Sequence, residues 1–109
     1  MATTYKVLGT SNPSATTATT LYTVPATTSA IVSTIHICNQ SVNSGTFRLA
    51  IRPAGATLAA NHYLAYDTPI PGNDSISLTI GITLATTDVI TVYASSSSMS
   101  FLAFGTEIT

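Results

Sequence analysis

The stretch SISLTIGITL, residues 75–84, alternates strictly between aliphatic and small side chains. Side chains of an extended strand point to opposite faces in turn, so this pattern predicts one strand with a buried face and an exposed face. Ser, Thr and Gly occupy the exposed positions, where charged residues would usually stand. The aliphatic positions are Ile76, Leu78, Ile80, Ile82 and Leu84.

A second alternation occurs in TFRLAIR, residues 46–52. Phe47 and Leu49 point to one face of the predicted strand, together with Ile51. Arg48 and Arg52 point to the other face. The pattern therefore places both arginines on the same outer surface.

Six further segments are rich in β-branched and aromatic residues and are bounded by turn-forming sequences. About eight short strands, with turns every 8 to 12 residues or so, are typical of an antiparallel β-sandwich or jelly roll. We therefore predict a single all-β domain of this class. The six segments are residues 4–9, 20–24, 30–38, 62–67, 88–94 and 98–105.

The two remaining regions are poor in strand signals. TSNPSATTATT, residues 10–20, has low complexity and no large apolar side chain, which predicts an extended arm or long loop. We expect an N-terminal strand and arm over residues 1–19 and a β-sandwich domain over residues 20–109. The Ala-rich stretch 53–64 begins with Pro and Gly, so it holds at most one helical turn.

Charge is scarce throughout the chain. Charged residues make up 6% of the 109 residues, the net charge is −1, and there are three basic residues. A nucleic-acid binder needs clustered Lys and Arg, so we expect no nucleic-acid partner. We also expect no membrane insertion, because no apolar run is long enough, and the N-terminus shows no secretory signal. With so little net charge to keep copies apart, a homo-oligomer is expected.

The titratable side chains do not suggest catalysis. No nucleophile elbow, phosphate-binding loop or dinucleotide-binding motif occurs, and the serines lack an evident activating base. We predict a protein that is not an enzyme, with no catalytic residue, no cofactor site and no metal site. The carboxylates and histidines are Asp67, Asp74, Asp88, Glu107, His36 and His62.

His36 and Cys38 form an H-x-C pair on one predicted strand face. Zinc sites use three or four protein ligands, and His62 is the one further residue that could join the pair. We therefore expect Cys38 to be a small buried apolar residue. We expect His36 to be half-buried or to lie at an interface.

Surface residues of two kinds are candidates for assembly contacts. The two arginines could bind carboxylates of a partner, or pair with Asp67 or Glu107 of the same chain. Tyr22, Tyr63, Tyr66 and Tyr93 are expected at the sheet rim with their hydroxyls in water, or in an assembly contact. The assembly-interface candidates are Tyr5, Lys6, Arg48, Arg52, Tyr63 and Tyr66.

Several motifs together resemble small β-sandwich virion proteins of tailed bacteriophages, cyanophages among them. The motifs are LYTVP at 21–25, CN at 38–39, FRLA at 47–50, ISLTIGITL at 76–84, DVITVYAS at 88–95 and FLAFGTEIT at 101–109. The resemblance covers about residues 20–109 and consists of turn and core patterns. It carries no catalytic residue.

The resemblance implies a capsid cement or decoration protein of a virion assembled in the host cytoplasm. Its partners would be the major capsid protein or other virion proteins, and its own copies, for example as trimers with the 1–19 arm lying along a neighbour. A tail, baseplate or fibre component is an alternative that shares every motif. A glycan-binding β-sandwich module is a second alternative, which requires exposed aromatic residues beside Asn and Asp loops.

Overall fold

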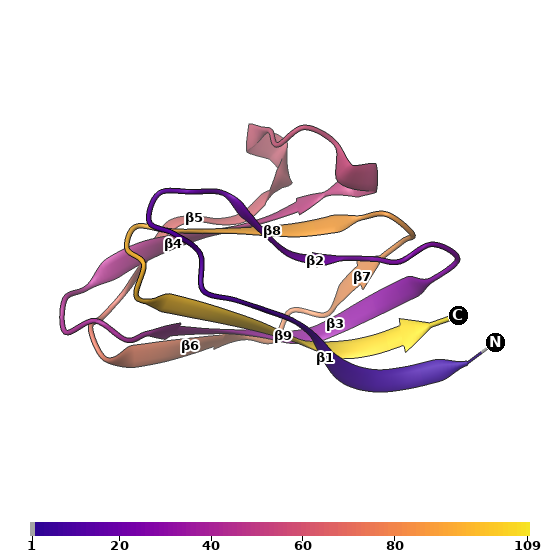
Figure 1. Cartoon of the computed structure of the whole chain (residues 1–109), viewed down its shortest axis with the longest axis horizontal. Coiled ribbons are helices and arrows are strands. Elements are labelled where there is room, and N and C mark those ends of the chain that lie inside the picture. Colours follow the sequence, from indigo (N-terminus) through magenta and orange to yellow (C-terminus); the bar gives the residue numbers. More distant parts are fainter. Residues whose placement is uncertain (1) are drawn as a thin grey trace.

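Two antiparallel sheets pack face to face in the computed structural model, which describes residues 2–109 (Figure 1). The elements in chain order are β1 (Thr3–Ser11), β2 (Thr19–Thr23), β3 (Ser29–Asn39), β4 (Gly45–Arg52), η1 (Pro53–Gly55), η2 (Ala60–His62), β5 (Tyr63–Ile70), β6 (Asp74–Leu78), β7 (Ile82–Leu84), β8 (Val89–Ala94) and β9 (Met99–Ile108).

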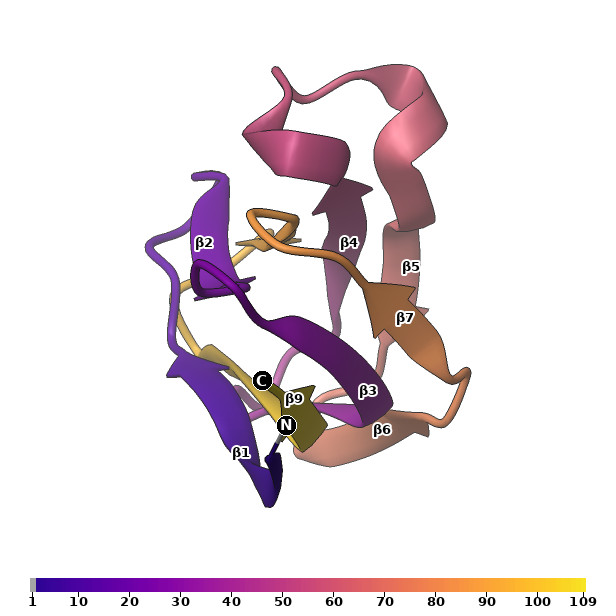
Figure 2. The same ribbon diagram turned by 90° about the vertical axis from the view of Figure 1, so that its right-hand side faces the viewer.

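Sheet A has the strand order β1-β9-β3-β6, and β7 also pairs with β3. Sheet B has the order β2-β8-β4-β5. The two layers face each other across the core, and the loop with the two short 3-10 turns stands above the end of β4 and the start of β5 (Figure 2). The predicted all-β sandwich is therefore confirmed.

The stretch 75–84 forms two strands and not the single predicted one. β6 ends at Leu78, β7 begins at Ile82, and both pair with β3. Gly81 has a φ of 59°, a conformation that interrupts an extended strand. Ile80, expected to be buried, is 51% exposed in the interruption. The sandwich consequently has nine strands.

The N-terminal segment belongs to sheet A. Thr3–Ser11 pairs along its length with β9 of the same chain, and is not extended away from the domain. Residues 12–18 form a loop, in which the Thr16 N–H donates to the Ala94 carbonyl at 2.8 Å. The Ala-rich stretch 53–64 contains two separate 3-10 turns, one more than expected.

The core lies between the sheets and consists of the inward positions of both. The rings of Phe47 from sheet B and Phe101 from sheet A meet edge to face, with centroids 6.3 Å apart. Each fully buried side chain of this size stabilises the fold by about 1.5–3 kcal/mol. The largest fully buried side chains are Phe47, Phe101, Ile35, Ile37, Leu49, Ile70, Leu84, Ile90, Met99, Val24, Val32 and Val92.

Asn39 is the one buried amide at the end of β3, with 1% of its surface exposed. Its Nδ2 donates to the carbonyls of Asn43, Ile70 and Pro71 at 3.0–3.3 Å, and its Oδ1 accepts from the Ser41 N–H. The side chain thereby ties the end of β5 in sheet B to β3 in sheet A. Within residues 2–109, every buried side-chain nitrogen or oxygen has a hydrogen-bond partner.

Candidate functional site

The outer face of sheet B carries a stack of aromatic rings around one guanidinium. Arg48 Cζ lies 4.1 Å from the ring centre of Tyr66 and 4.2 Å from that of Tyr93. Arg48 Nε donates to Asp67 Oδ1 at 2.7 Å. This hydrogen bond lowers the pKa of the Asp67 carboxyl and raises the pKa of the guanidinium. Arg48 is thus fixed on three sides by its own chain.

Two irregularities in β5 build this face. In a regular strand Tyr63 and Tyr66, three residues apart, would point to opposite faces. The pairing with β4 shifts twice, so that Leu49 faces Ala65 while its neighbour Ala50 faces Tyr63. Extra residues of this kind are β-bulges, and they turn both tyrosines to the outer face. Asp67, at a φ of 49°, lies in the second irregularity.

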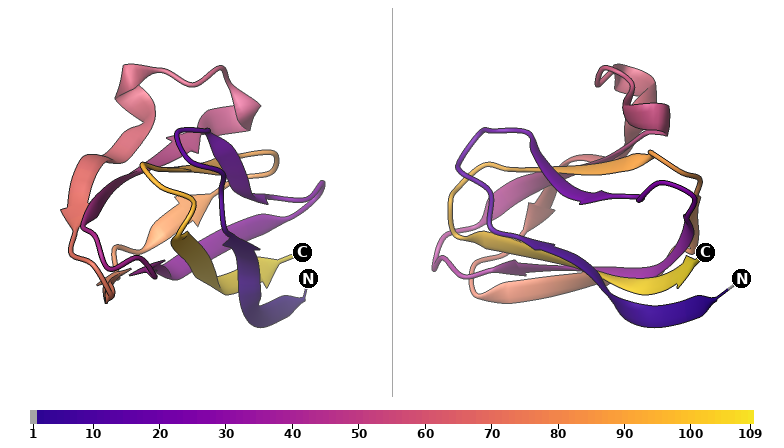
Figure 3. Two further views of the ribbon diagram at one scale, coloured as in Figure 1. Left: turned by 60° about the vertical axis from the view of Figure 1, so that its left-hand side comes forward. Right: turned by 45° about the vertical axis from the view of Figure 1, so that its right-hand side comes forward.

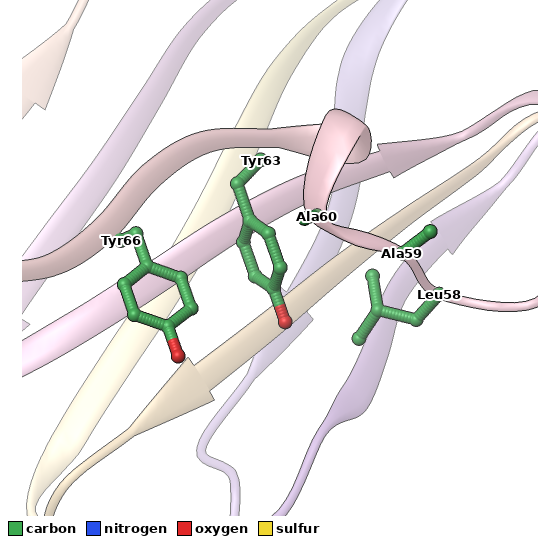
Figure 4. A pocket seen from close by; sticks show the side chains of 5 residues that line it. All are labelled: Leu58, Ala59, Ala60, Tyr63 and Tyr66. Atoms are coloured by element: carbon green, nitrogen blue, oxygen red, sulfur yellow. The ribbon is translucent and has the colours of Figure 1, made fainter.

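The two tyrosines border an open depression of about 480 Å³. Their rings are nearly perpendicular, at 87°, with centroids 4.9 Å apart. Both hydroxyls point to the same side. Leu58, in the loop between the 3-10 turns, lies on the side of Tyr63 away from Tyr66 (Figure 4). The lining is apolar apart from the two hydroxyls, and Ala59 and Ala60 complete it.

Arg52 lies on the same outer face as Arg48 but binds different partners. Its Nε donates to Thr91 Oγ1 at 3.0 Å, and its Nη1 donates to the carbonyls of Gly55 and Ala56 at 3.3 and 3.1 Å. These bonds hold the first 3-10 turn against β8. Arg52 therefore serves the loop above the sheet and does not reach the Arg48 stack.

The outer face of sheet A is apolar near the two termini. Tyr5 is 83% exposed on β1, and Val7 and Ile31 are about half exposed. The register aligns Tyr5, Thr106 and Ile31 in one row across β1, β9 and β3. Ala2 and Thr109 are hydrogen-bonded to each other at this end of the sandwich, where β1 begins beside the end of β9 (Figure 3). Tyr5 and Ile31 of this row are exposed to solvent.

A polar cluster crosses between the sheets behind this surface. Tyr22 of β2 donates its hydroxyl to Glu107 Oε2 at 2.6 Å, and Lys6 Nζ lies 3.3 Å from Glu107 Oε1. Burial, together with the carboxylate, raises the pKa of Tyr22. The bond from Tyr22, and then that from Lys6, lowers the pKa of Glu107. The cluster fastens β2 to the pair β1 and β9.

Two predictions about single side chains are wrong. Tyr22 is buried, with its hydroxyl bonded to Glu107, and does not sit at the rim with its hydroxyl in water. Cys38 is half-buried on the outer face of sheet A and not in the core, because β3 directs Ile35 and Ile37 inward. His36, on the same face, is half-buried as expected, with Nδ1 2.7 Å from Ser77 Oγ.

All seven charged side chains are engaged within the chain. Besides the two ion pairs and Arg52, Asp88 accepts from the backbone N–H groups of Ala54 and Ala85, and Asp74 accepts from that of Ser75. Within residues 2–109 no three His, Cys, Asp or Glu side chains gather where they could hold a metal ion. The described residues contain no helix of the length and apolarity needed to cross a membrane.

The structure divides the predicted interface residues into groups. Arg48, Tyr63 and Tyr66 lie together on sheet B, whereas Tyr5 and Lys6 lie on β1 of sheet A, on opposite faces of the strand. Arg52 belongs to neither group. Sequence analysis names Tyr93 as a strand tyrosine but misses that its ring lies against Arg48. It also misses that Leu58 lines the depression beside Tyr63 and Tyr66, and that Asn39 ties the end of β3 to the end of β5. The one signal in the sequence for this anchoring role is that Asn39 directly follows the strand predicted over residues 30–38.

Comparisons with protein-family models, with curated proteins and with solved structures found no match to the chain. The geometry of the two outer faces is therefore the basis on which function is argued.

Proposed function

We propose that the chain is a non-enzymatic structural protein of a phage virion, of the capsid cement or decoration type. It would bind in several copies to the major capsid protein or to other virion proteins. The observation that carries the proposal is that all seven charged side chains bind partners within their own chain. Apolar and aromatic side chains, by contrast, are exposed on the outer faces of both sheets.

A surface of this composition suits contact with other protein chains. Interface cores are depleted in charge and enriched in tyrosine and arginine, as in the Arg48 stack with Tyr66 and Tyr93. A guanidinium already held by Asp67 and two rings gives up little freedom when a partner covers it. The sheet B surface is therefore preorganised for such a contact.

The mechanism would be mechanical. Each sandwich would lie across a junction between subunits of the shell and bury hydroxyl-rich and apolar surface there. Many modest contacts, repeated over a particle, add up through multivalency. This mechanism needs no chemical reaction, and the carboxylates of Asp67 and Glu107 are both engaged in ion pairs of their own chain.

Electron microscopy of the intact particle tests the proposal. Particles of the virus whose genome encodes the chain should show a sandwich of this shape on the outside of the shell. Shells stripped of the chain should recapture it, and should burst at lower temperature without it. A density located on the tail, baseplate or fibre would transfer the proposal to those structures. Absence of the chain from purified particles would refute it.

The depression beside Tyr63 and Tyr66 is the observation that favours a glycan-binding module as a second candidate. Sugars stack on exposed aromatic faces, and the two hydroxyls could serve as hydrogen-bond partners. Two features of this site suit sugar stacking poorly. The two rings are perpendicular, and Arg48 already lies against the ring of Tyr66. Binding on a glycan array that is lost in Tyr63→Ala would support this candidate over the first.

A further inference from the structure

The first half of β1 is an edge of sheet A that no other part of residues 2–109 covers. Each residue from Thr3 to Val7 is exposed, so this part of the strand is open on both faces and along its free side. At Gly9, β1 lies against the Leu21 carbonyl of β2. The pairing with β9 is regular from Thr3 to Val7, and the first irregularity follows Val7.

The hydrogen-bond pattern of this edge can be assigned. Ala2 and Thr109 exchange both backbone bonds, each 2.8 Å long. Bonded and non-bonded pairs alternate along an antiparallel ladder, so Thr4 and Lys6 also exchange bonds with β9. The N–H and C=O groups of Thr3, Tyr5 and Val7 consequently point away from β9, toward the open side.

We infer that the open edge Thr3–Val7 pairs with the same edge of a second copy of this chain. The two strands run antiparallel about a twofold axis at Tyr5, so that Tyr5 faces Tyr5 and Thr3 faces Val7 of the other copy. On each copy, Thr3, Tyr5 and Val7 then each donate their N–H to the other copy and accept an N–H from it at their carbonyl. The junction can hold up to six hydrogen bonds. Sheet A becomes continuous through both copies.

The register follows from charge and from the direction of the bonds. A shift by two residues one way would place Lys6 opposite Lys6 of the other copy, and like charges directly opposed are destabilising. A shift by two residues the other way would leave Val7 without a partner within the strand. With Tyr5 on the axis, Lys6 faces Thr4, and all three outward-pointing residues are used.

Several observations favour a second copy over an unrelated partner. The outer face of the strand presents Thr3, Tyr5 and Val7, a set that is complementary to itself in the reversed direction, as a twofold interface requires. The one charge on the segment, Lys6, is already paired with Glu107 of its own chain. The charged residue that could block edge pairing is thus engaged within its own chain.

The inference names the self-association surface of the proposed function, and it is tested with the full chain by sedimentation equilibrium. The wild type should dimerise. The double substitution Thr3→Lys with Val7→Lys opposes two lysines at both ends of the junction and should weaken dimerisation at least tenfold. The matched Thr3→Glu with Val7→Lys opposes opposite charges and should dimerise as well as the wild type. All altered side chains are exposed, and circular dichroism checks that each variant folds.

Oxidative cross-linking gives a second, independent readout. In a Cys38→Ser background, Tyr5→Cys should form a covalent dimer, because Cα atoms of a bonded antiparallel pair are about 5.5 Å apart, within reach of a disulfide. Thr10→Cys in the same background should not cross-link. Failure of Tyr5→Cys to cross-link, or unchanged association of the double lysine variant, would overturn the inference.

The outcomes separate this inference from the proposed function. A wild type that stays monomeric in solution yet binds to particles overturns the Tyr5 dimer and leaves the virion role standing. A dimer that cross-links through Tyr5→Cys but is absent from particles supports the dimer and refutes the virion role.

Discussion

β1 and β5 are both edge strands, and the chain treats them in opposite ways. β5 closes sheet B with two shifts in its pairing, a residue of positive φ at Asp67, and a proline at Pro69. β1 is the edge of sheet A, where the regular run of residues Thr3–Val7 is exposed on both faces and along the side away from β9.

Bulges, prolines and charges are the usual means by which proteins keep sheet edges from pairing with other chains. β5 has bulges and a proline, and its charge at Asp67 is fixed by Arg48. The segment Thr3–Val7 has neither a bulge nor a proline, and its lysine is likewise held by Glu107. The difference indicates that association is directed to one edge and prevented at the other.

Asn39→Leu should have the largest effect on stability, because Asn39 anchors the end of β5 to sheet A. The substitution removes three donated hydrogen bonds and leaves buried carbonyls such as that of Ile70 without their partner. We expect the free energy of unfolding to fall by about 2–4 kcal/mol, measured by urea denaturation. Asn43→Ala, an exposed change in the same loop, should cost less than about 0.5 kcal/mol. Equal losses in both variants would contradict the anchoring role.

Asp67→Val should cause the next largest loss of stability, because Asp67 lies at a bulge of the edge strand β5 and pairs with Arg48. A β-branched residue at a φ of 49° is strained by about 1–3 kcal/mol, and the ion pair with Arg48 is lost as well. Asp67→Asn keeps a residue that tolerates this backbone conformation and loses only a surface ion pair, so it should cost clearly less than Asp67→Val. Thermal unfolding of the two variants measures the difference. If Asn and Val cost the same, the backbone conformation of position 67 does not matter.

Tyr22→Phe should weaken the attachment of β1 and β9 to β2 by about 1–2 kcal/mol, because a hydrogen bond to a carboxylate is lost. The folded-state pKa of Glu107 lies below its ordinary value of 4.5, so its stabilising effect is present above that pH and disappears as the pH falls through the lowered pKa. The difference between wild type and Tyr22→Phe should therefore shrink when unfolding is repeated at about pH 3. A difference that is constant with pH would argue against the Glu107 bond as its cause.

Tyr5→Pro should have the smallest effect on the monomer, because the Tyr5 N–H points to the open side. Proline is tolerated on an edge strand where its missing N–H faces solvent, so we expect a loss below about 1 kcal/mol. Thr4→Pro removes a bond to β9 and should cost clearly more. Both are measured by urea denaturation at protein concentrations too low for association. The reverse order would show that the assignment of bonded pairs along β1 is wrong.

Much of the fold could be predicted because apolar and polar residues alternate along several of its strands. The inward positions of TFRLAIR, Phe47 and Leu49, are buried, and both arginines lie on the outer face as predicted. The alternation in 75–84 misled at Ile80, because periodicity alone does not show that Gly81 takes a positive φ. Local pattern thus predicted strands well and their continuity less well.

The candidate site was harder to predict, since it depends on register. Whether Tyr63 and Tyr66 share a face is decided by a bulge that arises from pairing with β4, far away in sequence. The alternative that Arg48 pairs with Asp67 was foreseen, but the second ring, Tyr93, comes from β8. The buried position of Tyr22 follows from a contact with Glu107, 85 residues later. Such contacts leave no trace in local composition.

Hydrogen exchange of individual amides tests the contrast between the two edges most directly. At low protein concentration, the amides of Tyr5 and Val7 should exchange rapidly, while those of Thr4 and Lys6 are protected by β9. As the concentration rises, Tyr5 and Val7 should become protected, and the amides on the free side of β5 should not change. If the Tyr5 and Val7 amides exchange at the same rate at every concentration, or if β5 is the strand that gains protection, the account of an open and a sealed edge is contradicted.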